Sequence, residues 1–381
     1  MKIVRIETFR VPPRWLFLRI ATDEGIVGWG EPIVEGRAET VAAAVAELSD
    51  VLLGADPRHI EDHWQVLAKG GFYRGGPVLS SALAGIDQAL WDIKGKALGV
   101  PVHELLGGPV RDRARVYRWI HGASGPELAE AGLRAVEQGY DAVKLNLVDR
   151  LRPLDSPATI RQAVDQLAAL REAVGWKVDI AVDFHGRFST ATARRTLPLL
   201  EPLQPMFVEE PVLPEFSRDL AALASTTPIP LATGERLYSR WDFRDVLPAG
   251  IAVAQPDLSH AGGISEVRRI AAMAEAYDVT LAPHCPLGPI ALAASLQVDF
   301  ATPNFLIQEQ SLDIHAQGGN AVVGHLADPA AFRFVDGHVE RPTGPGLGIE
   351  IDEEAVRRAA AEGHRWRNEI RRHQDGSFAE W

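Results

Sequence analysis

The chain has 381 residues and a formal net charge of −12, with 46% apolar and 24% charged residues. This balance is close to that of average globular proteins, so a full hydrophobic core is available and a disordered chain is excluded. The acidic charge, without any long run of Lys or Arg, makes nucleic acid a poor partner. Because an acidic surface repels anions, an anionic ligand would need a local positive centre such as a metal ion.

The cysteine content and the apolar runs indicate the compartment. Cys285 is the single cysteine and cannot form an intrachain disulfide, which fits a reducing compartment. Residues 1–10 alternate apolar and polar side chains like a strand and lack the apolar stretch of a signal peptide. No run reaches the roughly 18 uninterrupted apolar residues of a membrane span. The sequence therefore predicts a cytoplasmic protein without membrane contact.

Residues 1–114 are predicted to form an α+β capping domain. The strand-like segments are 2–9, 15–22 and 26–30, with a turn at Asp23-Glu24-Gly25 before the third. The clearest helix is 80–98, whose apolar residues Leu83, Ile86, Leu90, Ile93 and Ala97 recur at intervals of three and four. Gly99 and Pro101 end it.

The segment 115–315 is predicted to form a (β/α)₈ TIM-like barrel. It contains eight short apolar runs, each followed by a helical pattern: 116–120, 142–147, 179–185, 206–211, 230–235, 253–258, 279–284 and 305–310. Eight consecutive βα units close naturally into a parallel barrel. An open doubly wound sheet is the alternative, but no Gly-x-Gly-x-x-Gly follows the first run. Residues 316–381 are expected to pack back on the barrel and the capping domain.

Polar residues end most of these runs, and in such a barrel they converge on the face that carries active sites. Asp183, Glu209 and Glu235 are equally spaced along the chain, one βα unit apart. Three neighbouring carboxylates raise one another's pKa unless a cation lies among them, and Mg²⁺ prefers such oxygen ligands. A single such acid could simply cap the following helix, but three in register favour a metal site.

Spacing alone does not choose between Glu209 and Glu210, because strand alternation sends them to opposite faces. His185 lies two residues after Asp183, so the same alternation puts both side chains on one face. His284 and Asp257 end adjacent runs, where the carboxylate could orient the imidazole and make it more basic. A solvated His beside an unrelated Asp is the alternative.

Eight longer motifs carry a resemblance that spans nearly the whole chain. They are GWGEP at 28–32, GFYRGG at 71–76, GIDQALWDIKGK at 85–96, DFHGR at 183–187, VEEP at 208–211, GER at 234–236, QPDLSHAGG at 255–263 and APHCPLGP at 282–289. With these motifs the chain resembles the mandelate racemase branch of the enolase superfamily, and within it the sugar-acid dehydratases that act on D-galactonate.

The resemblance implies roles for the residues at the run ends. Asp183, Glu209 and Glu235 would bind Mg²⁺, which selects Glu209 over Glu210. The base would be His284 paired with Asp257, the acid would be His185, and Glu309 would stabilise charge developing on the substrate carboxylate. The capping domain would form a lid, with Trp15, Tyr73 and Arg74 touching the substrate.

One departure separates the chain from the racemases of that branch. Where those carry Lys-x-Lys on the second barrel strand, this chain has Lys144-Leu145-Asn146, so the second lysine, which serves there as a base, is missing. The Lys-x-Asn pattern is similar to that of the dehydratases, and Asn146 is a candidate substrate ligand.

The resulting hypothesis is a hydro-lyase that converts D-galactonate to 2-dehydro-3-deoxy-D-galactonate and water. His284 would take the C2 proton, and His185 would protonate the leaving C3 hydroxyl. A dehydratase of another aldonic acid and an epimerase or racemase on the same site are the alternatives. A non-catalytic binding protein would need neither a base nor an acid. The expected partners are a small sugar acid and further copies of the chain in a homo-oligomer.

Overall fold

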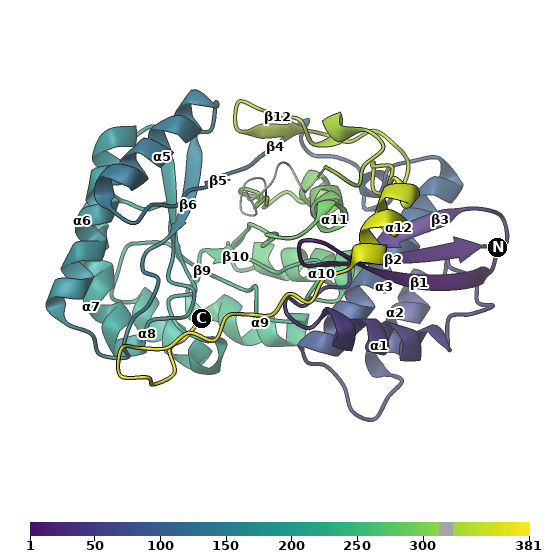
Figure 1. The fold of residues 1–381 in the computed structure, drawn as a ribbon, viewed down its shortest axis with the longest axis horizontal. Coiled ribbons are helices and arrows are strands. Elements are labelled where there is room, and N and C mark those ends of the chain that lie inside the picture. Colours follow the sequence, from purple (N-terminus) through teal and green to yellow (C-terminus); the bar gives the residue numbers. More distant parts are fainter. Residues whose placement is uncertain (312–322) are drawn as a thin grey trace.

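The computed structural model describes residues 1–311 and 323–381. An N-terminal α+β domain lies against one side of a parallel barrel, and the C-terminal segment runs across both (Figure 1). This is the predicted fold class. The predicted boundary between residues 315 and 316 lies outside the described residues.

The N-terminal domain is a three-stranded antiparallel meander with helices packed against it. Its strands are β1 Ile3–Val11, β2 Trp15–Thr22 and β3 Val27–Gly30, and its helices are α1 Ala38–Ser49, α2 Ile60–Lys69, α3 Pro77–Leu98 and α4 Val102–Leu105. Helix α3 begins earlier than predicted because Pro77 fits the first turn, where its missing N–H costs nothing. Gly99, in a left-handed conformation, ends the helix as expected.

Helix α3 joins the two domains through buried polar side chains. Asp87 accepts hydrogen bonds from the backbone N–H and the hydroxyl of Ser265, at 2.9 and 2.6 Å. The Trp91 indole N–H donates to the same hydroxyl at 2.9 Å, and the Gln88 amide donates to the Leu258 carbonyl at 2.8 Å. The polar residues of the motif at 85–96 therefore fix the N-terminal domain on the barrel.

Seven strands of the described chain pair in parallel, in chain order. They are β5 Arg118–Trp119, β6 Ala142–Asn146, β7 Asp179–Asp183, β8 Phe207–Glu209, β9 Leu231–Thr233, β10 Val253–Ala254 and β11 Thr280–Leu281. The eighth predicted run closes the ring through parallel bridges from Phe305 to Leu281 and from Gln308 to Val116. The barrel is therefore closed, with its eighth segment held by isolated bridges.

Helices and short connections surround the ring. The remaining α-helices are α5 Gly125–Glu137, α6 Pro157–Val174, α7 Thr190–Leu200, α8 Leu220–Ala224, α9 Arg240–Val246, α10 Gly263–Glu275, α11 Pro289–Ala301 and α12 Glu353–Glu362. The 3₁₀ turns are η1 Glu201–Leu203, η2 Pro214–Asp219, η3 Leu247–Ala249 and η4 Pro329–Phe332. Strands β4 Arg113–Arg115, β12 Phe334–Val335 and β13 His338–Glu340 form a separate small antiparallel sheet. Across the described residues, every helix is too short or too polar to cross a membrane.

A separate apolar cluster takes one buried residue from each of the eight barrel segments. Its members are Tyr117, Ala142, Ala181, Phe207, Ala232, Val253, Ala282 and Ile307. Layers of this kind fill the interior of such barrels. Because side chains in a strand alternate, the residue two positions further along each segment points to the same interior, one layer nearer the carboxyl end.

Candidate active site

The layer two residues beyond the apolar cluster is almost entirely polar. It consists of Trp119, Lys144, Asp183, Glu209, Gly234, Gln255, His284 and Glu309. Gly234 is the exception because a Cβ there would meet the Gln255 backbone nitrogen at 2.8 Å, and its φ of +147° suits glycine. The acid Glu235 follows Gly234 directly. The barrel therefore presents a mostly polar ring at the carboxyl ends of its strands, in which Lys144, Asp183, Glu209, His284 and Glu309 are ionisable.

Lys144 is the cation at the centre of this ring, and it is fully buried. Its ammonium donates to Glu209 at 2.6 Å and to Glu309 at 3.1 Å, and lies 3.9 Å from Asp183. These acids outweigh the burial that would otherwise lower the pKa of Lys144, and hold it well above its ordinary value. The acidic chain therefore holds a buried protein cation among three of the acids of this ring.

The three predicted metal ligands are buried at the ends of neighbouring strands. Burial is the main cause that raises the pKa of Asp183 to about 6 and that of Glu209 to about 8, with Lys144 opposing both shifts. Burial and the charge of Glu210 raise the pKa of Glu235 well above its ordinary value. Such a site favours an added cation.

The oxygens of Asp183, Glu209 and Glu235 do not all lie as close together as the ligands of one metal ion would. Among the described residues, the group whose ligand atoms all lie within 4.8 Å of one another is Asp257, His260 and His284. Glu209 instead faces Lys144 and the Gln255 amide, which donates to it at 2.7 Å. Two imidazoles and one carboxylate would suit zinc better than Mg²⁺.

Glu210 was expected to face away from the acids; it pairs with Arg236 but stays close enough to affect two of them. It lies beyond the end of β8, with a φ of +42°, and accepts two hydrogen bonds from Arg236 at 2.8 and 2.6 Å. Its charge still contributes to the raised pKa of Asp183 and Glu235. Strand alternation does not apply here because the strand has already ended.

His284 and Asp257 form the predicted pair across adjacent segments. His284 Nδ1 lies 2.7 Å from Asp257 Oδ2, and Asp257 Oδ1 accepts the backbone N–H groups of Ser259 and His260. The other ring nitrogen, Nε2, lies 3.3 Å from Glu235. Burial alone would lower the pKa of His284, but Glu235 and the other acids outweigh it and raise the pKa well above its ordinary value.

His185 reaches the same site by a turn, not by strand alternation. Strand β7 ends at Asp183, and His185 has a φ of +52° with its backbone N–H bonded to Asp183 at 2.7 Å. Its imidazole Nδ1 lies 2.9 Å from the carbonyl oxygen of Trp381. Burial, followed by the charge of Arg187, lowers the pKa of His185 to about 4.

Glu309 is fully buried and accepts hydrogen bonds from three donors. The Trp119 indole donates to one of its oxygens at 2.7 Å and the Cys285 N–H to the other at 2.8 Å, besides the bond from Lys144. Burial would raise the pKa of Glu309, but Lys144 and His284 together outweigh it and lower the pKa to about 2.

These groups surround a cavity of about 380 Å³, a volume typical of small-molecule sites. Its lining includes Lys144, Asp183, Glu235, His185 and His284, with Arg14 and Glu35 from the N-terminal domain and Asn368 and Trp381 from the C-terminal segment. Asn146 also lines it, and its buried side-chain oxygen has no hydrogen-bond partner there. With His121, His260 and Arg236, which also line it, acids, four imidazoles and three cationic side chains face one small-molecule cavity.

Two family models match the chain. One is described as an enolase C-terminal domain-like family and covers residues 127–355; the other, the mandelate racemase / muconate lactonizing enzyme N-terminal domain, covers residues 8–107. The chain belongs to the mandelate racemase and muconate lactonizing enzyme family. The resemblance drawn from the motifs is therefore confirmed.

Named relatives extend this finding over the full length. The chain is 54% identical to D-galactonate dehydratases from Variovorax paradoxus and Ralstonia nicotianae, covering 100% of both chains in each case. Among solved structures it is similar to a putative galactarate dehydratase from Agrobacterium radiobacter, bound to sodium and L-malate, at 34% identity with full coverage of both chains and a TM-score of 0.91. A putative dehydratase from Mesorhizobium loti is 33% identical with a TM-score of 0.89, over 94% of this chain and 98% of its own.

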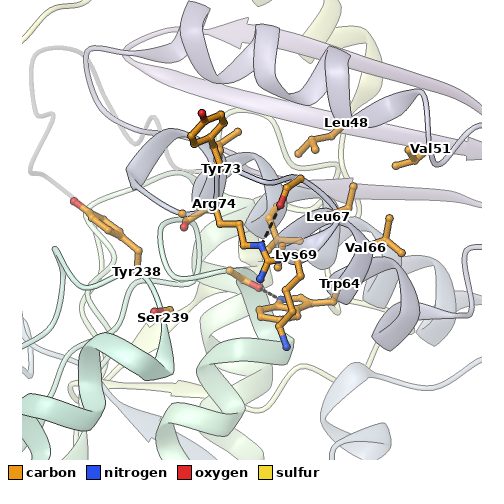
Figure 2. Close-up of a pocket in the computed structure, with 18 of the residues that line it drawn as sticks. Leu48, Val51, Trp64, Val66, Leu67, Lys69, Tyr73, Arg74, Tyr238 and Ser239 are labelled. Carbon is orange, nitrogen blue, oxygen red and sulfur yellow. Dashed lines mark hydrogen bonds between the residues drawn. The ribbon is translucent and has the colours of Figure 1, made fainter.

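The three residues of the N-terminal domain that were expected to touch the substrate, Trp15, Tyr73 and Arg74, lie outside the cavity. Trp15 is fully buried in the N-terminal domain, with its ring stacked 5.9 Å from that of Phe17. Tyr73 and Arg74 line a different hollow, of about 600 Å³, beside helix α2 (Figure 2). The Arg74 guanidinium bonds its own loop at Gly71, and the Tyr73 side chain is 88% exposed. Tyr238 lines both hollows and lies between them.

Several cavity residues were not singled out from the sequence. Lys144 and Trp119, and also Gln255, which bonds Glu209 without lining the cavity, could have been found because each lies two positions after an apolar residue in a predicted strand. His260 lies 3.6 Å from Asp257 and 3.3 Å from Glu35, and nothing in its spacing marks it. Trp381 comes from the far end of the chain, where no barrel pattern applies.

Proposed function

We propose that this enzyme is a Mg²⁺-dependent hydro-lyase that converts D-galactonate to 2-dehydro-3-deoxy-D-galactonate and water. The observation that carries the reaction class is the presence of a carboxylate-paired His284 and a separate His185 in one cavity with Lys144. The substrate rests on the relatives named D-galactonate dehydratase, which match the full chain.

The donor set fits Mg²⁺. Asp183, Glu209 and Glu235 are buried carboxylates at successive strand ends, and oxygen ligands of this kind suit Mg²⁺; burial, followed by the charges around them, raises their pKa, and a bound cation would oppose that shift. These three residues would hold the ion. When bound, Mg²⁺ would supply the charge that stabilises the substrate carboxylate and the enediolate, the known scheme of enolase-superfamily sites with a His or Lys base.

His284 is assigned the first proton transfer. Because Nδ1 donates to Asp257, Nε2 is the nitrogen that takes the C2 proton of the sugar acid, once it has released the proton that the neighbouring Glu235 and the raised pKa keep on the ring. Asp257 is itself held by two backbone N–H groups, so it fixes the orientation of the ring and stabilises the imidazolium. A base positioned in this way typically contributes about 10²- to 10⁴-fold to the rate.

His185 and Glu309 complete the reaction. His185 acts in its imidazolium form, which its lowered pKa makes the minor form before substrate binds and which the negative charge of the bound substrate would favour. It donates from Nε2 to the C3 hydroxyl, the C3–O bond breaks, and water leaves with that proton. The C2–C3 enol then loses its hydroxyl proton and gains one at C3 to give the keto acid. Glu309 can donate a hydrogen bond to the substrate carboxylate only in its protonated form, which an arriving anion would favour.

A panel of aldonic and aldaric acids tests the proposal. With Mg²⁺ present, D-galactonate should give 2-keto acid with the highest kcat/KM, and EDTA should abolish turnover until Mg²⁺ is restored. Another acid exceeding D-galactonate by tenfold or more would overturn the substrate but not the reaction class. Exchange of the C2 proton without keto acid would indicate an epimerase. Full activity with EDTA present would rule out the proposed dependence on Mg²⁺. Cytoplasmic location and self-association stay predictions.

A further inference from the structure

The segment that follows helix α12 connects the two domains across the cavity. It leaves the N-terminal domain, crosses the front of the barrel and turns back toward the strand ends (Figure 1). At its start, His364 Nε2 lies 2.9 Å from the Trp15 carbonyl oxygen, and Arg367 pairs with Glu39 at 2.7 Å. These contacts hold the first part of the segment on the N-terminal domain.

The second part of the segment is held on the barrel. Arg372 and Phe378 form an antiparallel bridge, so residues between them make a tight return. Arg371 donates to the Asp149 carbonyl at 2.9 Å, in the loop after β6. Ala379 N–H donates to the Arg371 carbonyl at 3.0 Å, and its side chain is 1% exposed. The chain is therefore fixed immediately before Trp381.

Trp381 is placed directly against His185. The two ring centroids lie 5.0 Å apart, with the planes tilted by 49°, and the Trp381 carbonyl oxygen lies 2.9 Å from His185 Nδ1. The Arg371 guanidinium lies 5.5 Å from the centroid of the indole. The side chains of His185 and Trp381 both line the cavity.

This contact determines which nitrogen of His185 faces the substrate. A main-chain oxygen can only accept, so His185 must carry its Nδ1 proton whether the ring is neutral or charged. Nε2 is then the nitrogen that gains and loses a proton, and the indole ring restricts rotation of the imidazole. Such support matters because His185 sits in a turn past the end of β7, so the pairing of strands does not set the direction of its ring.

We propose that Trp381 is a positioning residue that holds His185 with Nε2 directed at the leaving hydroxyl. The inference rests on the proposed function, in which His185 protonates that hydroxyl. It requires no change in the base His284 or in the metal ligands. Loss of the ring should therefore impair only the step that needs an acid. A misplacement of a catalytic group by about 1 Å can cost about a hundredfold in rate.

The test compares two leaving groups. Water must be protonated as it leaves C3, whereas fluoride departs from 3-deoxy-3-fluoro-D-galactonate as F⁻ without a proton. Trp381→Ala should lower kcat for keto-acid formation from D-galactonate at least about tenfold, yet keep fluoride release within about threefold of wild type. His185→Asn should show the same split, and Trp381→Phe, which retains an aromatic ring, should recover most of the loss.

Trp176→Ala is the matched control, because Trp176 is 68% exposed and also lies beside a guanidinium, that of Arg171 at 5.1 Å. It should change neither reaction. Equal losses of water and fluoride release in Trp381→Ala, or no loss in either, would overturn the inference. If wild type makes no keto acid from D-galactonate, the proposed substrate fails, and the comparison is made with the acid of the panel that does turn over and its 3-fluoro analogue.

Discussion

Replacing Lys144 with Met would remove the cation at the centre of the ring while keeping a side chain of similar length. Glu209 and Glu309 would lose a charged donor at 2.6 and 3.1 Å in a fully buried environment. Breaking a buried ion pair by removing one partner typically costs about 3–5 kcal/mol. At about 2.1 cal/mol/K per residue, unfolding of 381 residues has an entropy near 0.8 kcal/mol/K, so the midpoint should fall by about 4–6 °C.

Activity should fall further than stability, because the substrate anion loses a protein cation. Removing one preorganised charge-stabilising donor typically lowers kcat about 10²- to 10³-fold. The assays are thermal unfolding by circular dichroism with EDTA present, and keto-acid formation with Mg²⁺ present. Lys177→Met, at an exposed lysine, is the control and should change neither. An unchanged midpoint together with unchanged kcat in Lys144→Met would refute the view that Lys144 organises the acids.

Two further predictions concern proton transfer and pH. In D₂O, His284→Asn should block both exchange of the C2 proton and keto-acid formation. His185→Asn should stop keto-acid formation yet leave His284 able to exchange the proton. NMR of the substrate measures the exchange, and exchange with His284→Asn but none with His185→Asn would reverse the assignment of base and acid. Burial is the main cause that raises the pKa of Asp87 to about 7, above its unfolded value, so its contribution to stability is complete below about pH 4 and is lost as pH rises toward 7. Denaturant unfolding should therefore show Asp87→Asn gaining stability relative to wild type between pH 4 and 8, and a difference independent of pH would contradict a protonated, buried Asp87.

The fold was predictable because hydrophobic period and chain length restrict it strongly. Eight apolar runs separated by helical patterns leave few topologies, and apolar spacing identified the helix at 80–98, although not that the two domains meet on it. The bounds of the strands were less accurate. The run 253–258 contains only the two-residue strand β10, since Pro256 has no N–H to donate and Asp257 forms an isolated bridge to His284.

The site was predictable where it depends on strand ends and not where it depends on loops or distant segments. Asp183 and Glu209 face each other in the β7–β8 register, as their equal spacing indicated. His185 and Glu210 both adopt positive φ past the strand ends, so period-two reasoning cannot position them. Tyr73 lies in a loop whose path depends on tertiary contacts, and Trp381 reaches the site through contacts made by residues far from the barrel strands in sequence.

The distribution of charge explains how a chain of net charge −12 can receive an anion. The repulsion expected from the sequence applies to the molecule as a whole, whereas the cavity has its own balance. Arg236 neutralises Glu210 and Arg14 lies 3.8 Å from Glu35, whereas Lys144 is the protein cation that bonds Glu209 and Glu309. Lys144 cannot be replaced by a metal ion alone, because it also bonds Glu309, on the opposite side from the proposed metal ligand Glu209. The protein cation and the proposed metal site thus share Glu209, while Lys144 also reaches Glu309, and a sugar-acid carboxylate would be attracted by both cations.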